Sequence, residues 1–343
     1  MHLSTQFNGS STLDDNQKRA VRFPQGVTVA VLVMTVFFFV FGTIGNALVC
    51  FVISKRHDLR KVPHYLFLNL SIIGLVSSVF VMPFLIAIIA RAYMMNNSEA
   101  MDVLCKLRVF FAFFCSAINA LSLSLMAIDR QDCVFRPFRR RIRKDNVLKI
   151  LLTIWSTLII ISIFFIIVLS TDRAQCPSSD PFNLKSSFSG STILFNVFIT
   201  VFGTTFNCSA ILIIVITFVR ITKKLRSSSL PESRSNFLRF EASITKLTYK
   251  TCGIFILSWF PVIISHAFAR FSSHADTDII EIVKLVTLAF TNFTYAANPI
   301  LHYTMLKVGP HLQPLSHASG NQVVMRPLGS FEVAALNTEN MNI

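Results

Sequence analysis

The sequence predicts an all-α integral membrane protein in which seven transmembrane helices form one bundle. The chain of 343 residues is 53% hydrophobic and only 14% charged, and a soluble domain of this size would carry more charge. Seven apolar stretches reach the roughly 20 residues that a helix needs to cross the hydrocarbon of a bilayer. The loops between these stretches are too short to hold a separate domain, so we expect one bundle.

The predicted spans follow one another with polar loops between them. They cover residues 27–54, 63–90, 102–134, 147–170, 189–219, 244–271 and 279–304. Residues 1–26 are polar and lack the apolar core of a cleavable signal peptide, so the first span is expected to insert the chain itself. We expect an N-terminal tail at 1–26, a membrane domain at 27–305 and a disordered C-terminal tail at 306–343.

Lysine and arginine cluster in the first, third and fifth loops, as they do in the cytoplasmic loops of membrane proteins. This bias predicts a multi-pass plasma-membrane protein with its N-terminus outside and its C-terminus inside. Because the cations behind the net charge of +15 lie in short loops beside apolar spans, nucleic-acid binding is not expected. These cations include Lys55, Arg56, Arg60, Lys61, Arg136, Arg139, Arg140, Arg141, Arg143, Lys144, Lys223, Lys224, Arg226, Arg234 and Arg239.

The predicted spans carry no pattern of an enzyme. They hold no cluster of carboxylates and histidines and no nucleophile with a base. The seven cysteines show no paired CxxC spacing, so we expect no metal and no cofactor. Glycosylation sequons begin at Asn8 and Asn96 on the predicted outer side, whereas those at Asn69, Asn207 and Asn292 lie within spans, where no glycan is expected.

Four of the spans contain short motifs of polar residues and prolines. The third span ends in Asp129 and Arg130, and Pro137 and Phe138 follow. A charged pair at a membrane boundary is explained on its own by side chains that reach solvent. The further motifs are Gly45 and Asn46 in the first span, Phe255, Ser258, Trp259 and Pro261 in the sixth, and Asn298, Pro299 and His302 in the seventh.

In this order the motifs resemble those of the rhodopsin-like, or class A, G-protein-coupled receptors. The resemblance runs from the first span to the end of the seventh, and each motif falls in the matching span. It implies that residues 27–305 bind an extracellular ligand and activate a heterotrimeric G protein when the inner ends of helices three and six separate. It also implies a disulfide between Cys105 and Cys176 that ties the second outer loop over the pocket.

The resemblance also assigns roles to charged and proline residues. Arg130 is expected to form an ion pair with Glu241 across helices three and six in the resting state. Pro261 is expected to kink the sixth helix, so that a small push at Trp259 swings its inner end. Two alternatives stay open: Glu241 balances Arg239 in solvent, and Pro261 serves packing alone.

The second inner loop is the candidate contact with the G protein. Phe138 follows Pro137 and precedes a run of arginines, and it resembles the residue that enters a hydrophobic pocket on the Gα subunit. An exposed aromatic of this kind is otherwise an anchor at the membrane interface. The basic surface around it suits either the G protein or anionic lipid of the inner leaflet.

Several positions depart from the family pattern. Gly74 stands where the family normally keeps an aspartate that binds sodium, so the ion site is in doubt. Asn119 is expected to hydrogen-bond Asn298 instead. Three further departures, which remove hydroxyl groups associated with the active state, are Gln131, Phe218 and His302. A non-signalling or atypically coupled receptor is therefore the main alternative.

The predicted pocket is apolar beneath a cationic rim. Ala112 and Asn292 occupy the positions that bind amines in aminergic receptors and retinal in opsins, so neither ligand is expected. The lining expected from the family is Phe110, Phe113, Phe202, Val262, His266, Lys284 and Leu288, with Arg91 and Arg270 near the mouth. This composition suits an acidic lipid or an amphipathic peptide with a carboxylate, unless the cations only face water.

A transporter is the remote alternative to a receptor. Transporters usually show internal repeats, broken helices or ionisable residues near the bilayer midplane. The predicted spans are almost free of charge, which favours the receptor.

Overall fold

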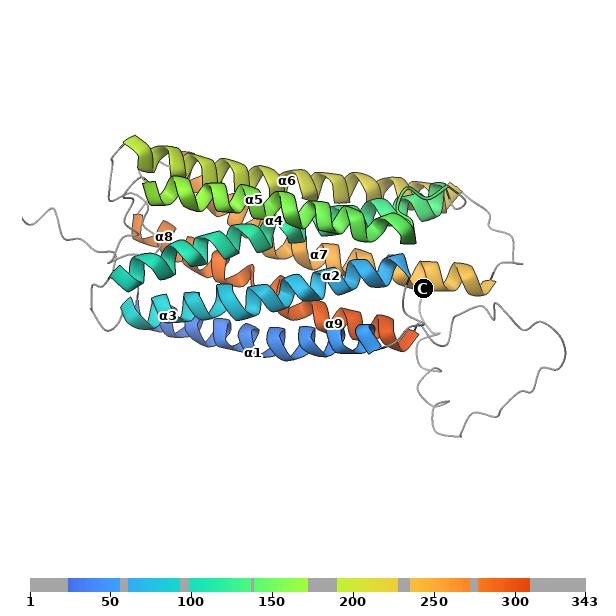
Figure 1. Cartoon of the computed structure of the whole chain (residues 1–343), viewed down its shortest axis with the longest axis horizontal. Coiled ribbons are helices and arrows are strands. Elements are labelled where there is room, and N and C mark those ends of the chain that lie inside the picture. The colour runs from blue at the N-terminus through green and yellow to red at the C-terminus, as the bar shows by residue number, and fades with distance from the viewer. Residues whose placement is uncertain are drawn as a thin grey trace, which may run out of the picture.

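The helices of the chain lie side by side along the long axis of the molecule (Figure 1). A computed structural model describes residues 24–55, 61–92, 99–136, 139–171, 190–227, 235–271 and 277–308. The helices are α1 (Gln25–Lys55), α2 (Val62–Val76), the π-helical turn η2 (Ser77–Val81), α3 (Met82–Ala92), α4 (Glu99–Phe135), α5 (Lys144–Thr171), α6 (Gly190–Ser227), α7 (Ser235–Phe271), α8 (Thr277–Phe290) and α9 (Phe293–Val308). No strand occurs in these ranges, which confirms the all-α class.

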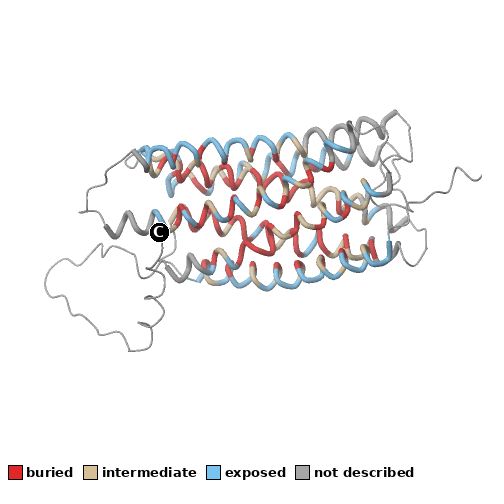
Figure 2. The backbone as a smooth tube through the Cα atoms, turned by 180° about the vertical axis from the view of Figure 1, so that it is seen from behind, coloured by how far each residue is buried: buried red, intermediate tan, exposed pale blue. Residues whose placement is uncertain are grey.

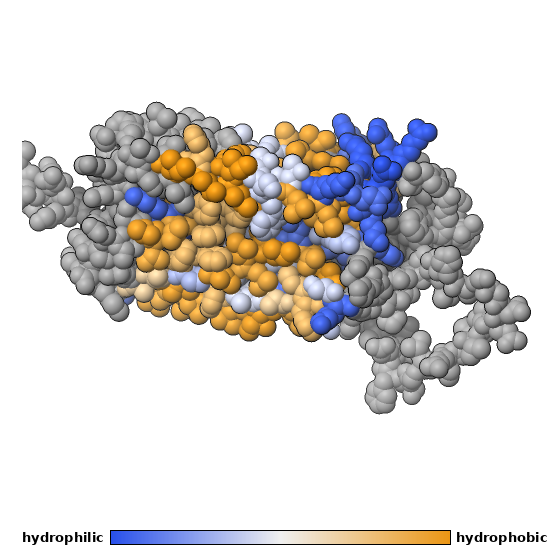
Figure 3. All heavy atoms as spheres, viewed as in Figure 1, coloured by the Kyte–Doolittle hydropathy of each residue, from blue (hydrophilic) through white to orange (hydrophobic). Residues whose placement is uncertain are grey.

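Six stretches of helix in the described ranges are long and apolar enough to cross a membrane, and α8 with α9 covers the seventh predicted span. Their buried faces point into the bundle and their exposed faces outward (Figure 2). Large apolar side chains such as Phe37, Ile160 and Leu212 are exposed on the outer surface, and apolar residues cover the middle of the bundle (Figure 3). A surface of this kind is stable only in lipid.

Exposed lysines and arginines gather at one end of the bundle, which we call the basic end. There α1, α4, α6 and α9 end and α2, α5 and α7 begin, at the right in Figures 1 and 3. Its exposed cations include Arg136, Arg139, Arg141, Arg143, Lys144, Lys149, Arg220, Lys223, Lys224, Lys246 and Lys250. At this end α6 and α7 extend beyond the predicted limits of 219 and 244, because a helix keeps its backbone hydrogen bonds after leaving the hydrocarbon.

The second predicted span contains a widened turn where a continuous helix was expected. The Met82 backbone N–H donates to the carbonyl of Ser77, five residues back, and so closes the π-helical turn η2. Pro83 follows directly, and a proline has no N–H to donate to the carbonyl four residues before it. The turn accommodates this missing donor and directs the Ser77 and Ser78 side chains into the bundle, where both are buried.

The last predicted span is divided into α8 and α9 by a turn at Thr291 and Asn292. The Thr291 hydroxyl donates to the Leu288 carbonyl at 2.6 Å, and the Asn292 amide donates to the Ala289 carbonyl at 3.2 Å. These side chains compete with backbone N–H groups for the same carbonyls, which disfavours a regular helix. The prediction of one continuous helix over 279–304 was therefore wrong at this turn.

Close contact between α1 and α9 depends on a glycine, an asparagine and a proline. Pro299 cannot donate a hydrogen bond to the Tyr295 carbonyl four residues earlier. Asn46 takes over this role, since its Nδ2 donates to the Tyr295 carbonyl at 3.0 Å. The neighbouring Gly45 lets the proline approach, because a Cβ atom there would lie 2.6 Å from the Cβ of Pro299.

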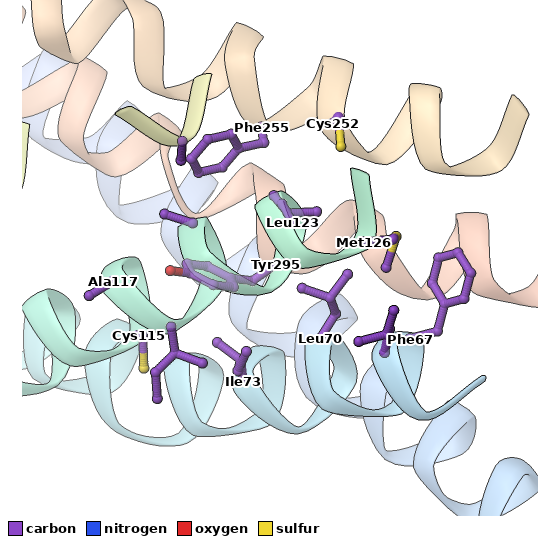
Figure 4. Packing of buried hydrophobic residues seen from close by; sticks show 14 of the residues in the cluster. Phe67, Leu70, Ile73, Cys115, Ala117, Leu123, Met126, Cys252, Phe255 and Tyr295 are labelled. Atoms are coloured by element: carbon purple, nitrogen blue, oxygen red, sulfur yellow. The ribbon is translucent and has the colours of Figure 1, made fainter. Parts of the chain in front are cut away.

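The apolar core lies around α4, which has the largest share of buried residues among the six candidate spans. Figure 4 shows core side chains converging between α2, α4, α7 and α9. They include Phe67, Leu70, Leu123, Met126, Phe255 and Tyr295. This packing fixes the positions of the polar residues that α4, α7 and α9 carry.

Substitution of Gly45 by alanine tests the α1–α9 contact. We expect Gly45→Ala to destabilise the protein by about 1–3 kcal/mol, because the added methyl group overlaps Pro299. The measurement is thermal unfolding of the purified protein in nanodiscs. Gly253→Ala is the matched control, since a Cβ atom at this helical glycine would meet no heavy atom within 4 Å. Equal unfolding temperatures for the two variants would contradict the contact.

Candidate functional site

A buried ion pair lies at the basic end of α4. Asp129 and Arg130 are both 0% exposed. Arg130 Nε donates to Asp129 Oδ2 at 3.2 Å, and its Nη2 pairs with the same oxygen. The pair is therefore not a solvated helix end, which was the alternative interpretation. Removing one partner of a buried pair leaves an uncompensated charge, at a cost of about 3–5 kcal/mol.

Asp132 anchors the segment that connects α4 to α5. Its Oδ1 contacts Arg141 Nη2 at 3.1 Å, and its Oδ2 accepts the Arg141 backbone N–H at 3.1 Å. Asn146 completes the anchor, because its Oδ1 accepts the Arg143 N–H at 2.6 Å and its Nδ2 donates to the Arg141 carbonyl at 2.9 Å. These bonds hold Arg141 and Arg143, both exposed, at the ends of α4 and α5 that carry Asp132 and Asn146.

Sequence reasoning missed Asp132, although a signal was present. The carboxylate lies three residues after Asp129, so both lie on neighbouring positions of one helix face. A second acid so close to the first, before a run of arginines, is a reason to expect an anchor for that run.

The α7 motif brings an aromatic pair next to a proline. The ring of Phe255 is buried in the core, and its centroid lies 6.2 Å from that of Trp259. Pro261 lies inside α7, where it leaves the Leu257 carbonyl without its helical donor and so weakens the helix locally. Trp259 Nε1 is buried and has no hydrogen-bond partner in the described part of the chain.

The α9 motif is buried between α9 and α2. The His302 ring lies 2.9 Å from the Ser71 hydroxyl through Nδ1, and it packs edge-on against Phe67. Pro299 is buried against Gly45. A histidine thus links α9 to α2 where the family usually has a tyrosine.

The predicted hydrogen bond between Asn119 and Asn298 was wrong. Both side chains are buried, but neither amide has a hydrogen-bond partner among the described residues. The amides therefore lie beyond hydrogen-bonding distance of each other, and α9 is tied to α1 through Asn46 instead. Buried amides of this kind usually bind ordered water.

Asn46 also explains the glycine at position 74. A Cβ atom at Gly74 would lie 2.6 Å from Asn46 Nδ2 and 2.8 Å from Asn46 Oδ1. The asparagine amide thus fills the volume that any side chain at position 74 would need.

The asparagines of the three sequons that lie within predicted spans are buried, and two of them bond other helices. Asn69 donates to the Ser122 hydroxyl at 2.7 Å and accepts the Trp155 indole N–H at 2.8 Å, so it joins α2, α4 and α5. Asn207 donates to Ser116 at 3.1 Å, and Asn292 is buried as well. A glycan cannot be attached to an amide in such a position.

A small cavity lies between η2, α4, α7 and the α8–α9 turn. Its volume is about 40 Å³. The lining residues are Ser77, Val81, Arg108, Ala112, Cys115, Trp259, Leu288, Thr291, Asn292 and Tyr295. The cavity thus contacts Trp259 of α7 and the irregular turns of two other spans.

Only part of the predicted pocket coincides with this cavity. Leu288 lines it, whereas Phe110, Phe113, Val262 and Lys284 are described but are not among its lining residues. Phe110 instead packs against Phe111 and Phe114 on its own helix. The side chains of Phe202, His266, Arg91 and Arg270 lie outside the described residues.

Arg108 is a cavity residue that the sequence prediction omitted. Its side chain is 6% exposed, although it lies within the candidate span of α4. An ionisable residue inside a membrane span indicates a functional site by default. The spacing of Arg108, Ala112 and Cys115 at successive turns of one helix was the available signal.

Several other predicted residues lie outside the described part. They are Asn8, Asn96, Pro137, Phe138, Cys176 and the side chains of Cys105 and Glu241. The ion pair of Arg130 with Glu241, the disulfide and the glycans therefore stay predictions.

The sequence model described as "7 transmembrane receptor (rhodopsin family)" matches residues 45–302. The chain belongs to the rhodopsin family of seven-transmembrane receptors. The receptor is 24% identical to neuropeptide Y receptor type 2 of Cavia porcellus and of Homo sapiens, over 76% of this chain and 69% of each relative. It is also 24% identical to somatostatin receptor type 4 of Rattus norvegicus, over 76% of this chain and 65% of that receptor.

Membership in this family confirms the resemblance to class A receptors that the motifs indicated. The receptor is a multi-pass membrane protein of signal transduction and not an enzyme. The match begins at Gly45 and ends at His302. It therefore includes the α1 residues and the α9 residues that contact each other, from Gly45 and Asn46 to Tyr295 and Pro299.

The Asp132 anchor can be tested by hydrogen exchange. We expect Asp132→Ala to raise the exchange rate of the Arg141 amide about tenfold or more, because that N–H loses its acceptor. Arg141→Ala is the matched variant, since it removes only a contact of a side chain that is 58% exposed and keeps the backbone bond. Mass spectrometry of peptides that cover residues 139–146 gives the rates. Equal rates in both variants would contradict the anchor.

Proposed function

We propose that the receptor binds an extracellular ligand and in response activates a heterotrimeric G protein at the inner face of the plasma membrane. One observation carries this proposal. The helices α4 and α7 both line the cavity, through Arg108 and Trp259. Both also reach the basic end, where the last turns of α4 carry the buried Asp129 and Arg130. A ligand that changes how α4 and α7 pack therefore acts on both ends at once.

The proposed switch uses the weak point in α7. Pro261 lies two residues after Trp259, so displacement of the indole changes the bend of α7 where its hydrogen bonding is already incomplete. A bend there moves the basic end of α7 away from α4. Arg130, which Glu241 is proposed to hold across this gap in the resting state, then becomes available to the G protein.

The basic end is the proposed inner face. Its exposed arginines and lysines suit the positive-inside rule and would face acidic segments of a G protein or anionic lipid. Asp132 and Asn146 hold part of this surface in a fixed position. Phe138, next to that part of the chain, is the proposed hydrophobic contact with Gα.

The proposed ligand is an amphipathic peptide, with an acidic lipid as the second choice. The named relatives are receptors for neuropeptide Y and somatostatin, which favours a peptide. Ala112 lines the cavity and supplies no carboxylate for an amine, while Arg108 supplies a positive charge. On the outer side we propose the Cys105–Cys176 disulfide and glycans at Asn8 and Asn96.

A receptor that couples weakly or not at all is the second candidate. The specific observation in its favour is His302, which bonds Ser71 and packs on Phe67 where a tyrosine would supply a hydroxyl. The space beside Gly74 is filled by Asn46, so the usual acidic group is absent as well.

Ligand-free G-protein activation in transfected cells tests the proposed function. We expect Glu241→Ala to raise basal activation of one class of Gα severalfold, because the inner ends of α4 and α7 lose an ion pair that holds them together. Arg130→Ala and the double variant should give no such rise, since both lack the cation that meets the G protein. Surface expression, read from an N-terminal epitope tag, controls for misfolding of the Arg130 variants.

The opposite result favours the second candidate. If all variants reach the surface and match mock-transfected cells across the whole panel of Gα subunits, the receptor does not activate G proteins by this route. If the double variant is as active as Glu241→Ala, the role of Arg130 is wrong while coupling itself stands.

A further inference from the structure

A tyrosine of α7 reaches across to α6 near the basic end. The ring centroids of Tyr249 and Phe218 lie 3.8 Å apart. The Tyr249 hydroxyl donates to the Phe218 carbonyl at 3.3 Å and lies 3.3 Å from the Thr222 hydroxyl. A hydroxyl has one proton to donate. Because the proton of Tyr249 goes to the carbonyl, the Thr222 hydroxyl is the donor to the Tyr249 oxygen. We call these three residues the α6–α7 clasp.

Other hydroxyls in the same half of α7 bond within that helix. Thr248, Thr251 and Ser258 each donate to the carbonyl four residues earlier, at 2.9, 3.0 and 2.8 Å. These bonds do not depend on where α7 lies relative to its neighbours. The bonds of Tyr249 do, because their acceptor and their donor lie on α6. The clasp is therefore sensitive to the separation of the two helices.

The distance of the clasp from Pro261 makes it sensitive to the bend of α7 as well. Tyr249 lies about 18 Å along the helix axis before that proline. At this distance, a change of about 10° in the bend moves the tyrosine by about 3 Å. A movement of that size away from α6 breaks both hydrogen bonds, because they form only over a narrow range of distance.

The partner helix of the clasp is itself packed on α4. Asn207 of α6 donates to the Ser116 hydroxyl of α4 at 3.1 Å. Ala210 and Ile214 of α6 belong to the same buried core as Ile118 of α4. The clasp thus ties α7 to a helix that packs against α4, and it opposes the outward movement of the basic end of α7.

We propose that Tyr249 is a positioning residue that holds the basic end of α7 against α6 and so limits opening of the receptor without a ligand. This inference rests on the proposed function, and it adds a restraint separate from the ion pair proposed for Arg130 and Glu241. Loss of one hydrogen bond shifts an equilibrium between a closed and an open state about two- to tenfold. Breaking the clasp raises the open population by a factor of that size.

The test compares Tyr249→Phe and Thr222→Val with a matched control, Tyr303→Phe. The first removes the hydroxyl and keeps the ring, and the second removes the donor to Tyr249. Tyr303 is an exposed tyrosine of α9 outside the clasp. One readout is ligand-free G-protein activation in transfected cells, corrected for surface expression. The other is the rate at which N-ethylmaleimide alkylates the native Cys252 of the full-length receptor in nanodiscs, from mass spectrometry of its peptides.

Cys252 reports the opening without a G protein. It lies one turn after Tyr249 on α7, is 0% exposed and belongs to the apolar core. The reagent reaches such a thiol only when the packing around it opens, so the rate follows the open population. Cys115 of α4 is buried in the same core and is the internal control, because the clasp does not hold it.

We expect Tyr249→Phe to raise both basal activation and Cys252 alkylation about two- to tenfold. Thr222→Val should raise both less, because Tyr249 keeps its bond to the carbonyl. Tyr303→Phe should match the wild type. In combination with Glu241→Ala, the factor of Tyr249→Phe should multiply that of the single variant, because the two restraints are separate.

Unchanged Cys252 alkylation in Tyr249→Phe would overturn the proposal. A rise that Cys115 shares would also overturn it, since the variant then loosens the whole core. If Tyr249→Phe does not fold, unchanged alkylation in Thr222→Val decides against the clasp instead. Faster Cys252 alkylation with no G-protein activation in any variant leaves the clasp standing and removes the proposed function. Activation by Glu241→Ala without any response to Tyr249→Phe removes the clasp alone.

Discussion

The hydrogen bond from the Asn46 amide to the Tyr295 carbonyl is the contact on which the arrangement of the bundle depends. Pro299 leaves that carbonyl without a helical donor, and in lipid an unsatisfied carbonyl costs several kcal/mol. The donor therefore has to come from another helix, which fixes α1 against α9. Gly45 and Gly74 leave room for Pro299 and for the asparagine, so three spans meet at one point.

Two arginines on α4 are buried in different ways. Arg130 is paired with the adjacent carboxylate of Asp129, and the pair lies within a tightly packed region at the basic end. Arg108 instead lines a cavity together with other polar side chains. In the first arrangement the neighbouring carboxylate compensates the charge of the guanidinium group.

Hydropathy and loop charge predicted the helical fold because lipid requires long apolar runs, and these are visible locally in the sequence. The motif residues of α4, α7 and α9 were predicted from the resemblance to the class A receptors, because each motif falls in the matching span. The turns at Ser77–Val81 and at Thr291 were not predicted, because they depend on which donor a freed carbonyl finds. Spacing also could not decide which of several buried asparagines reaches α9. Asn119 was expected to bond Asn298, whereas it is Asn46 that bonds α9, at the Tyr295 carbonyl.

The π-helical turn has a consequence for comparing this receptor with its relatives. Because the π-helical turn holds one additional residue, the side chains that follow it are rotated by about 100° around the helix axis, relative to a continuous α-helix. The residues of α3 therefore face directions that differ from those in a relative whose second span is a continuous α-helix. Residues 62–76 and 82–92 have to be aligned with such relatives as two separate segments, offset by one position, before any side chain of α3 is equated with theirs.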